Sequence, residues 1–595
     1  MMSRDDYYRS RASEFSKKAE ILQRRENRLS LARLMTFIGA FLFFVLLFSI
    51  SVFISITVLV AGLCLFVGVV LRHIRTQRLK DYNNYMAAIN TLEAECINGK
   101  FSSYADGAGY ISREHPYSYD LDIFGHASLF QYLNRTASRP ASDMLAAWLS
   151  NAATAAEIKA RQQAIEELKP MIDWRQEMMT LCYENKNGGA DPESLLEWLN
   201  SKSIFENGSR QRAISIMLSI LGLTTTALVL AGMPAALLGT ALTINFIYYF
   251  TQQKRISKLH LKVTRSTEML ETYAGIIKMI ENGSFSSDRL TGLRSRLVST
   301  NRASESIRRL SKLVNRLDTR LNVLVSVPLN VFFFWDIHVC LALEKWNRKN
   351  AAEVPRWLDA MAEFEVISSF SNMAFNNPDW VMPVINEDYF VLRAVGMGHP
   401  LIAVQQRINN DITLEGRGHT ALITGSNMSG KSTFLRTCGI NTVLALTGSV
   451  VCASSFTVSH VQVFSSMRIS DSLEENTSSF YAELKRLAAI IKEAETNHGV
   501  FLLLDEILRG TNSNDRYTGS VALIRQLTSY GSVSMVATHD LKLADLSEEM
   551  PDKIDNYHFD VKINGEELFF DYKLTKGICT SLNASILMKK MGIRV

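Results

Sequence analysis

Long runs of apolar residues are the first feature of this chain. Residues 34–71 contain no charged side chain, and basic residues stand on both sides, at Arg28 and Arg33 before the run and at Arg72 and Arg75 after it. One membrane-crossing helix needs about 20 residues, so the run is long enough for two. We expect a transmembrane hairpin over residues 34–71 that turns near residues 49–51. The basic flanks place both of its ends in the cytoplasm.

A second apolar run covers residues 213–250. It is broken at Gly232 and Pro234, and Arg212 and Lys254 flank it. The run is rich in Gly, Ala and Thr, small residues that allow membrane helices to pack closely. We expect a second transmembrane hairpin over residues 213–250, with a buried bundle of soluble helices as the alternative.

A third apolar patch, at residues 323–343, has a different character. It contains Pro328, Asn330, Asp336 and His338, and ionisable side chains are costly in lipid. We therefore expect this patch to pack in a protein core.

Helical spacing of apolar positions dominates the remaining sequence up to residue 375. We expect a cytoplasmic N-terminal helix over residues 1–33 and a helical core in two parts, residues 81–212 and 251–375. Residues 251–320 are predicted to be long helix with few breaks. From residue 376 short apolar runs alternate with helices, which is typical of an α/β domain. The predicted fold is mixed: helical membrane hairpins and a helical core, then an α/β domain over residues 376–595.

Charge and cysteine content narrow the class of protein. The chain has 595 residues, with 64 Lys and Arg against 59 Asp and Glu, which excludes a histone-like polycation. Residues 251–320 hold fifteen Lys and Arg against six Asp and Glu. Such a face can contact a nucleic-acid backbone or anionic lipid headgroups, and the alternative is a solvated face next to a membrane. The seven cysteines show no paired spacing, so we expect reduced thiols and no zinc site.

A glycine-bounded loop at residues 425–432 carries the clearest chemistry. It follows an apolar run and leads into a helix, so its backbone N–H groups and the positive helix end can surround a polyphosphate. Lys431 would reach the outer phosphates, and the Ser432 hydroxyl would bind Mg²⁺. The predicted nucleotide-binding residues of this loop are Gly425, Ser426, Asn427, Met428, Ser429, Gly430, Lys431, Ser432 and Thr433.

Two further apolar runs end in residues that complete such a site. The run at 500–504 is followed by Asp505 and Glu506, and the run at 533–537 is followed by Thr538 and His539. Parallel strands deliver their carboxyl ends to one edge of a sheet. We expect Asp505 to hold Mg²⁺, Glu506 to orient or deprotonate the attacking water, and His539 to approach the γ-phosphate of ATP.

These motifs resemble those of the MutS family. The loop with Asn427 and Met428 in its interior is similar to the MutS P-loop, and residues 505–511, Asp-Glu-Ile-Leu-Arg-Gly-Thr, are similar to its Walker B segment. The similarity extends to residues 537–539, to Tyr572-Lys573-Leu574 near the C-terminus and, more weakly, to the helical core. The resemblance implies an ABC-like ATPase domain that uses ATP and Mg²⁺ and closes its sites as a homodimer. It also implies that Ser478 reaches the γ-phosphate of the partner subunit, and that the helical core contacts DNA.

The chain departs from the family pattern in three places. Arg407, before Ile408, stands where the family has an aromatic residue that stacks on adenine, so a guanidinium is expected to stack there. Asn476 and Thr477 replace the glycine and arginine usual in the helix that acts across the dimer. The chain begins with an apolar hairpin where mismatch-repair members carry a mismatch-reading domain, and the Phe-x-Glu wedge of that domain has no equivalent here.

The sequence favours a membrane-anchored MutS-like ATPase, multi-pass in the inner membrane with its ATPase domain in the cytoplasm, that couples ATP hydrolysis to movement of lever helices. DNA binding is implied by the resemblance, whereas mismatch reading by the wedge is not supported. The alternative is an ATP-driven transporter or membrane-complex motor without DNA binding. A scaffold that binds ATP without turnover is disfavoured, because Asp505 and Glu506 are both present.

Overall fold

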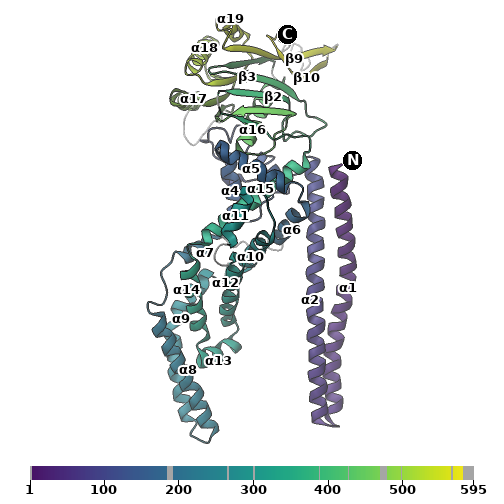
Figure 1. Cartoon of the computed structure of the whole chain (residues 1–595), viewed down its shortest axis with the longest axis vertical. Coiled ribbons are helices and arrows are strands. Elements are labelled where there is room, and N and C mark those ends of the chain that lie inside the picture. The colour runs from purple at the N-terminus through teal and green to yellow at the C-terminus, as the bar shows by residue number, and fades with distance from the viewer. Residues whose placement is uncertain are drawn as a thin grey trace.

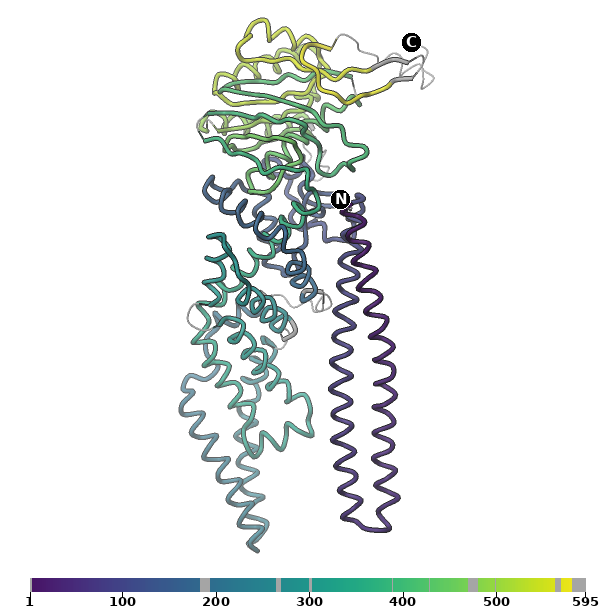
Figure 2. Tube along the Cα trace, turned by 45° about the vertical axis from the view of Figure 1, so that its right-hand side comes forward, coloured from purple at the N-terminus to yellow at the C-terminus, as the bar shows by residue number. Residues whose placement is uncertain are grey.

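The computed structural model describes residues 3–183, 192–263, 267–298, 302–387, 389–426, 428–468, 479–497, 499–564 and 567–579. Figure 1 shows an α/β domain at one end of an elongated molecule, a helical body next to it, and two helical hairpins. Both hairpins extend away from the α/β domain in the same direction, and Figure 2 shows the same arrangement from another side.

The first hairpin consists of α1 (Arg4–Phe48) and α2 (Val52–Ile97). The turn falls at residues 49–51, where the sequence predicts it. The polar ends of both helices join the helical body: the Tyr8 hydroxyl donates to Asn376 Oδ1 at 2.7 Å, and Glu93 forms a buried ion pair with Arg135. The apolar ends form the tip farthest from the α/β domain (Figure 1).

The helical body is built around α15 (Val354–Asn376), which is buried along most of its length. A helix that is apolar on every face has to lie inside a protein. Glu365 of α15 accepts hydrogen bonds from the backbone of Ala137 and Ser138, which ties α15 to the start of α4. The other helices of the body are α3 (Leu129–Leu133), α4 (Arg139–Ser150), α5 (Ala155–Leu168), α6 (Ile172–Tyr183), α7 (Pro192–Leu199), α10 (Thr267–Asn282), α11 (Asp288–Val298), α12 (Ala303–Asp318) and α14 (Trp335–Asn350), with 3₁₀ turns η1 (Ala108–Tyr110) and η3 (Thr319–Leu321).

The second hairpin consists of α8 (Gly208–Leu230) and α9 (Ala236–Val263), with the break at Gly232 and Pro234. Residues 251–320 are not one long helix, because the end of α9 is followed by the separate helices α10, α11 and α12. One of these breaks follows Asn282 at Gly283, where a Cβ atom would lie 2.6 Å from the Phe285 ring.

The prediction of core packing for residues 323–343 is wrong for their first half. Helix α13 (Val323–Phe333) buries Ser326 and Asn330 and exposes its apolar side chains, among them Leu324, which is 87% exposed. The second half, in α14, does pack in the body, and Asp336, Cys340 and Leu343 are buried. The sequence pattern did not show this division, because α13 packs on α8 and α9 and buries its polar Ser326 and Asn330 instead of exposing them to solvent.

Among the described residues, three helices are long and apolar enough to cross a membrane: α1, α2 and α8. The number becomes four if α13 and α14, which meet at 81°, are taken as one broken span. Helix α9 is not among them, because its uncharged stretch contains the polar residues Asn245, Gln252 and Gln253 before Lys254 and Arg255.

The α/β domain contains two sheets. The larger has the strand order β10-β9-β4-β8-β7-β6 and is parallel except for the antiparallel pair β9 and β10. The smaller has the order β1-β5-β2-β3. The strands are β1 (Val384–Asn386), β2 (Val391–Met397), β3 (Asn410–Glu415), β4 (Thr420–Gly425), β5 (Ser455–Ser459), β6 (Gln462–Ser466), β7 (Val500–Asp505), β8 (Val533–Thr538), β9 (Ile554–Asn564) and β10 (Glu567–Lys576). The helices are α16 (Lys431–Thr447), α17 (Ser479–Thr496), α18 (Ser513–Ser529), η4 (Leu541–Asp545) and α19 (Leu546–Glu549).

Helix α16 joins the two halves of the molecule. It contacts β7 and β8 of the larger sheet and, on another side, α4 and α5 of the helical body. Its Arg436 donates to the backbone oxygen of Asp120 at 3.0 Å, and Ala153 N donates to Leu446 O at 3.0 Å. The helix that follows the P-loop therefore contacts the helical body directly.

Candidate functional site

The loop between β4 and α16 has backbone conformations that favour glycine. Gly425 (φ 151°) and Gly430 (φ 101°) lie in the left-handed region. A Cβ atom on Gly425 would lie 2.8 Å from Ser429 Oγ, and one on Gly430 would lie 3.0 Å from the Tyr572 ring. Both glycines are thus required for the loop to curve tightly into the start of α16.

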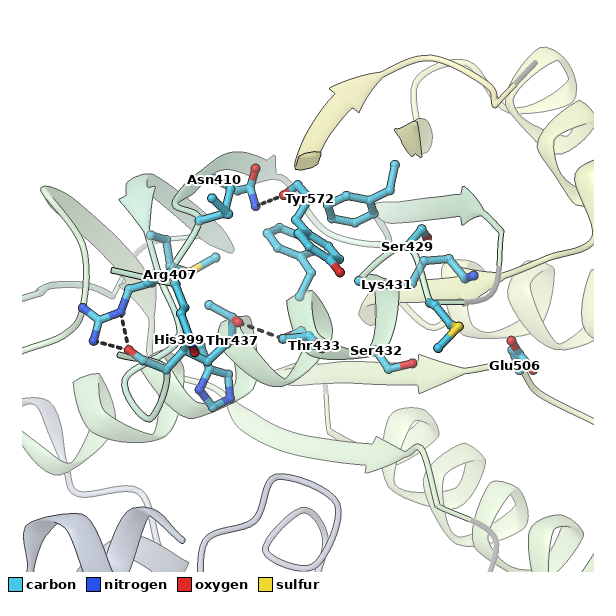
Figure 3. A pocket seen from close by; sticks show the side chains of 18 residues that line it. His399, Arg407, Asn410, Ser429, Lys431, Ser432, Thr433, Thr437, Glu506 and Tyr572 are labelled. Atoms are coloured by element: carbon cyan, nitrogen blue, oxygen red, sulfur yellow. Dashed lines mark hydrogen bonds between the residues drawn. The ribbon is translucent and has the colours of Figure 1, made fainter. Parts of the chain in front are cut away.

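Lys431 is held inside this loop. Its ammonium group donates to the backbone oxygens of Gly425 and Ser426, each at 2.8 Å. Burial lowers the pKa of Lys431, while Glu506 and Asp505 act in the opposite direction. Figure 3 shows Lys431, Ser432 and Glu506 at one end of the same cavity.

The strand ends meet as the sequence predicts. Strand β8 lies between β4 and β7, and Thr424 pairs with Thr538 while Asp505 pairs with Ala537. This register brings the P-loop, the Asp505-Glu506 pair and the Thr538-His539 segment to one edge of the larger sheet.

Ser432 and Asp505 fit a magnesium site. The Ser432 hydroxyl is hydrogen-bonded to the Asp505 carboxylate, whose Oδ1 atom is buried without a hydrogen-bond partner. Burial raises the pKa of Asp505, and the Ser432 hydroxyl and Arg509 partly oppose this shift. A buried carboxylate with a free oxygen beside a hydroxyl is the donor set that Mg²⁺ prefers.

Glu506 lies between the P-loop and His539. Its backbone adopts a positive φ of 49°, and its N–H donates to Ala537 O at 2.9 Å, which fixes the turn after β7. The carboxylate lies 3.6 Å from His539 Nδ1 and 3.2 Å from Arg509 Nε. Arg509 was not predicted from the sequence, although it belongs to the quoted 505–511 segment.

A cavity of about 540 Å³ extends from the P-loop toward the smaller sheet. Its volume lies within the roughly 300–1,000 Å³ usual for small-molecule sites. Outside the P-loop the lining includes the apolar and aromatic side chains of Met397, Ile402, Ile408, Phe434, Phe559 and Tyr572, together with the polar side chains of His399, Gln406, Arg407, Asn410 and Thr437. One end of the cavity is therefore suited to phosphates and the other to a flat, apolar group.

Tyr572 and His399 are lining residues that were not assigned a role from the sequence. The Tyr572 ring, carried by β10, lies against Gly430 at the mouth of the cavity, and its backbone oxygen accepts from Asn410 Nδ2 at 3.0 Å. Burial lowers the pKa of His399 to about 4, so this ring is neutral at physiological pH. The similarity at Tyr572-Lys573-Leu574 was the one signal in the sequence that pointed to this wall.

Arg407 and Ile408, the residues expected to contact adenine, line the cavity, but the Arg407 guanidinium is engaged elsewhere. Its Nε and Nη2 atoms donate to Ile402 O at 3.0 and 2.7 Å, and Nη1 donates to Cys452 Sγ at 3.1 Å. Figure 3 shows the guanidinium turned away from Lys431 and Ser432.

Two of the predicted site residues, Asn427 and Ser478, lie outside the described residues. Helix α17, which begins at Ser479, contacts the site through Glu483. This buried carboxylate accepts a hydrogen bond from Leu508 N, in the loop after Glu506, and burial raises its pKa.

Comparisons with known proteins agree with this geometry. A family model described as MutS domain V matches residues 421–591. The chain is 32% identical over 223 residues to the DNA mismatch repair protein MutS of Fusobacterium nucleatum, a match that covers 36% of this chain and 24% of that protein. It is 31% identical over 236 residues to MutS of Finegoldia magna, covering 38% of this chain and 27% of that protein.

A human relative, MutS protein homolog 4, is 31% identical over 237 residues, which covers 38% of this chain and 24% of the relative. The chain thus spans about a quarter of the length of these relatives. The matched domain contains the P-loop, the Asp505-Glu506 pair and His539. Over residues 421–591, the chain is therefore similar to domain V of the MutS family.

Proposed function

We propose that the protein is a membrane-anchored ATPase of MutS type that hydrolyses ATP and converts nucleotide binding into movement of its helical body. The observation that carries this proposal is the convergence of Lys431, Ser432, Asp505 and Glu506 at one end of a nucleotide-sized cavity.

Each of these side chains has a role that its position supports. Lys431 binds the outer phosphates, for which it exchanges its present backbone partners. Ser432 and Asp505 hold Mg²⁺, which when bound neutralises phosphate charge. Glu506 orients and deprotonates the attacking water, with His539 beside it.

The adenine end of the site involves two candidate side chains. Tyr572 presents an aromatic ring at the cavity mouth, whereas Arg407 first has to leave Ile402 O and Cys452 Sγ. We propose that Tyr572 stacks on the base and that Arg407, the residue expected from the sequence, mainly supports the wall.

Homodimer formation completes the site in this proposal. The resemblance of the nucleotide-binding motifs to those of the MutS family implies a dimer through the ATPase domain, with Ser478 acting on the partner's γ-phosphate. Glu483 connects the helix that follows Ser478 to the loop after Glu506, which supports communication between the dimer face and the catalytic carboxylate.

Membrane anchoring is supported by the way α8 and α9 pack. Their shared interface contains the small or polar residues Ser215, Gly222, Thr225 and Asn245, while large apolar side chains such as Ile220 and Phe246 are exposed. A soluble hairpin has the opposite polarity. Close contact through small residues, with an apolar exterior, suits a lipid environment.

Asp120 connects the nucleotide site to the helical body. Its carboxylate accepts hydrogen bonds from Ser465 Oγ near the end of β6 and from Met467 N and Arg468 N just after it. Its backbone oxygen accepts from Arg436 of α16. Movement of the P-loop helix is thereby transmitted to residues 116–122. This connection supports an output that is conformational.

DNA binding is the second candidate activity, favoured by the names of the relatives, and a DNA-independent transporter or motor is its rival. To separate them, we would measure ATP hydrolysis by the detergent-purified full chain with and without linear, branched and mismatched duplex DNA over a salt series. DNA binding predicts stimulation that weakens steeply with salt, because phosphate contacts release counterions. Turnover that no DNA changes, with no salt-sensitive binding, would remove the DNA candidate.

The variants Lys431→Ala and Glu506→Gln are the controls in this experiment. Glu506→Gln is expected to lower turnover about 10²- to 10⁴-fold, the usual contribution of a general base, while ATP binding is retained. Unchanged turnover in Glu506→Gln would remove the assigned base.

A further inference from the structure

Helix α13 has its polarity reversed relative to a soluble helix. It buries Ser326 and Asn330 and leaves Val323, Leu324 and Val327 exposed, with Leu324 at 87% and Val323 at 68%. Leu321, just before the helix, and Phe333, at its end, are also exposed. Contiguous apolar surface of this kind marks a binding surface.

The buried polar side chains of α13 and its neighbours fix the helix on the second hairpin. Asn245 Nδ2 of α9 donates to Leu218 O of α8 at 3.2 Å and to Val331 O of α13 at 2.9 Å. Helix α13 therefore packs directly on α8 and α9, and all three helices carry exposed apolar side chains.

The bend after α13 is also built into the fold. Phe334 is fully buried with a positive φ of 47°, and Asn330 Oδ1 accepts a hydrogen bond from Asp336 N at 2.9 Å at the start of α14. Helices α13 and α14 consequently meet at 81°. Figure 1 shows α14 running along the body beside α9, with α13 turned across its lower end.

The contacts of α13 show which part of α9 it packs against. Just before α13, Arg320 donates to Gln253 Oε1 at 2.8 Å and to Ser257 Oγ at 3.0 Å. This is the level at which the apolar stretch of α9 gives way to the exposed Lys254 and Arg255. At its other end α13 reaches Asn245, so it covers about two turns of the apolar stretch of α9.

From these observations we propose that α13 lies in the interfacial region of the cytoplasmic leaflet, with Leu321, Val323 and Leu324 among the acyl chains. Its 11 residues extend about 16 Å, too short to cross an apolar layer of about 30 Å. The neighbouring cations Lys254 and Arg255 face headgroups, where anionic lipid is favoured. The helix fixes the depth and tilt at which the helical body meets the membrane. The inference rests on the proposed membrane insertion of α8 and α9.

The test uses the full chain in lipid nanodiscs, with single cysteines that carry an environment-sensitive fluorophore. The background replaces Cys64, which is exposed, and Cys182 with serine; Cys96, Cys340, Cys438, Cys452 and Cys579 are buried. Leu324→Cys reports on α13, Leu223→Cys on the middle of α8, and Lys312→Cys on the water-exposed surface of α12. Quenchers are iodide in water and nitroxide lipids labelled either near the headgroup or at the end of the acyl chain.

We expect the label at position 324 to emit at shorter wavelength than that at 312, and to lose more fluorescence with the shallow nitroxide than with the deep one. The label at 223 should show the reverse order of depth. Quenching at 324 by iodide alone, or protection from every quencher, would show water or a protein partner on α13 and overturn the inference. If 223 is quenched by lipid and 324 is not, membrane anchoring stands and the role of α13 fails. If neither label is quenched by lipid, both proposals fail.

Discussion

At the scale of single residues, the site depends on charged groups that the fold holds out of water. Lys431 and Asp505 are both buried, and burial shifts their pKa values in opposite directions, down for the lysine and up for the carboxyl group. Each shift means that the charged form is disfavoured until a ligand compensates it. Burying these charged groups in the nucleotide-free protein therefore costs free energy, and binding of Mg²⁺ and phosphate offsets that cost.

This cost leads to a prediction for Asp505→Asn. Because the pKa of Asp505 is raised in the fold, the folded state keeps its proton to higher pH than the unfolded chain does, and stability is lost as pH rises through that folded pKa. We expect Asp505→Asn to raise the melting temperature of the nucleotide-free protein at neutral pH and to abolish Mg²⁺-dependent hydrolysis. In the wild type, the half-saturating Mg²⁺ concentration should rise as pH falls. Calorimetry and turnover across pH test this, and a less stable or fully active Asn variant would contradict it.

The two candidates for adenine stacking give a second prediction. Stacking on an aromatic ring contributes about 0.5–1.5 kcal/mol, so Tyr572→Ala should raise the KM for ATP about 2- to 10-fold. Tyr572→Phe keeps the ring and serves as the matched control with unchanged KM. If Arg407→Ala raises KM while Tyr572→Ala has no effect, the guanidinium expected from the sequence is the stacking group.

Much of this site could be predicted from sequence because its motifs are local. Spacing around Lys431 and the placement of Asp505 after an apolar strand were sufficient to bring these groups together. Tyr572 was harder to assign, since it approaches Gly430 from a strand more than a hundred residues away. The position of the Arg407 guanidinium depends on Ile402 O and Cys452 Sγ, and no sequence pattern contains those contacts.

At the scale of elements, the first hairpin is attached to the body by a buried polar joint. Glu93 of α2 pairs with Arg135 and accepts a hydrogen bond from Asn376 Nδ2 at 3.0 Å at the end of α15. Burial would raise the pKa of Glu93, but Arg135 and the neighbouring asparagines more than offset this and lower it. The Glu93 carboxylate therefore stays ionised at neutral pH and keeps its ion pair with Arg135.

Breaking this joint should be strongly destabilising. Glu93→Ala leaves the buried Arg135 without its carboxylate, which typically costs about 3–5 kcal/mol. Glu14→Ala, which removes an exposed pair with Lys18 on α1, is the control and should leave stability unchanged. Thermal or denaturant unfolding measures both. Equal stability of the two variants would show that the joint does not hold the hairpin to the body.

The elements also show where sequence periodicity is insufficient. The apolar run at 34–71 correctly predicted the turn at 49–51 and the apolar halves of α1 and α2, but not that each helix continues through a polar half, to Arg4 and to Ile97. Periodicity misjudged α13, since Asn330 and Asp336 look like signs of a soluble core. In the structure Asn330 Oδ1 accepts from Asp336 N at the bend, and the Asp336 carboxylate accepts from Tyr249 of α9. Periodicity also merged α10, α11 and α12, whose breaks are short.

At the scale of the whole molecule, both hairpins leave the body on the side opposite the α/β domain (Figure 2). A membrane at the tips would keep the nucleotide site in the cytoplasm, separated from the bilayer by the helical body and the polar half of the first hairpin. In the proposed mechanism, changes at the P-loop pass to the helical body through the contacts of Asp120 with α16 and β6.

Dimer closure is the step that would drive this movement. Glu506→Gln keeps the P-loop and Asp505, so it should still bind ATP with Mg²⁺. Because it lacks the base, it should not hydrolyse the ATP, and the closed, ATP-bound dimer should accumulate. We expect ATP with Mg²⁺ to increase the dimer fraction of Glu506→Gln, and Lys431→Ala to remain unaffected, as measured by light scattering in detergent. An oligomeric state that ATP leaves unchanged in Glu506→Gln would speak against nucleotide-driven closure.

The central claim is that one chain is both an ATPase and an integral membrane protein. The most direct measurement is Mg²⁺-dependent ATP hydrolysis in membranes from cells that express the full chain, after a wash with alkaline carbonate and return to neutral buffer, with Glu506→Gln membranes prepared in parallel. We predict that wild-type activity stays with the washed membranes and that Glu506→Gln membranes lack it. Release of the chain into the wash, or equal hydrolysis by both membrane preparations, would contradict the claim.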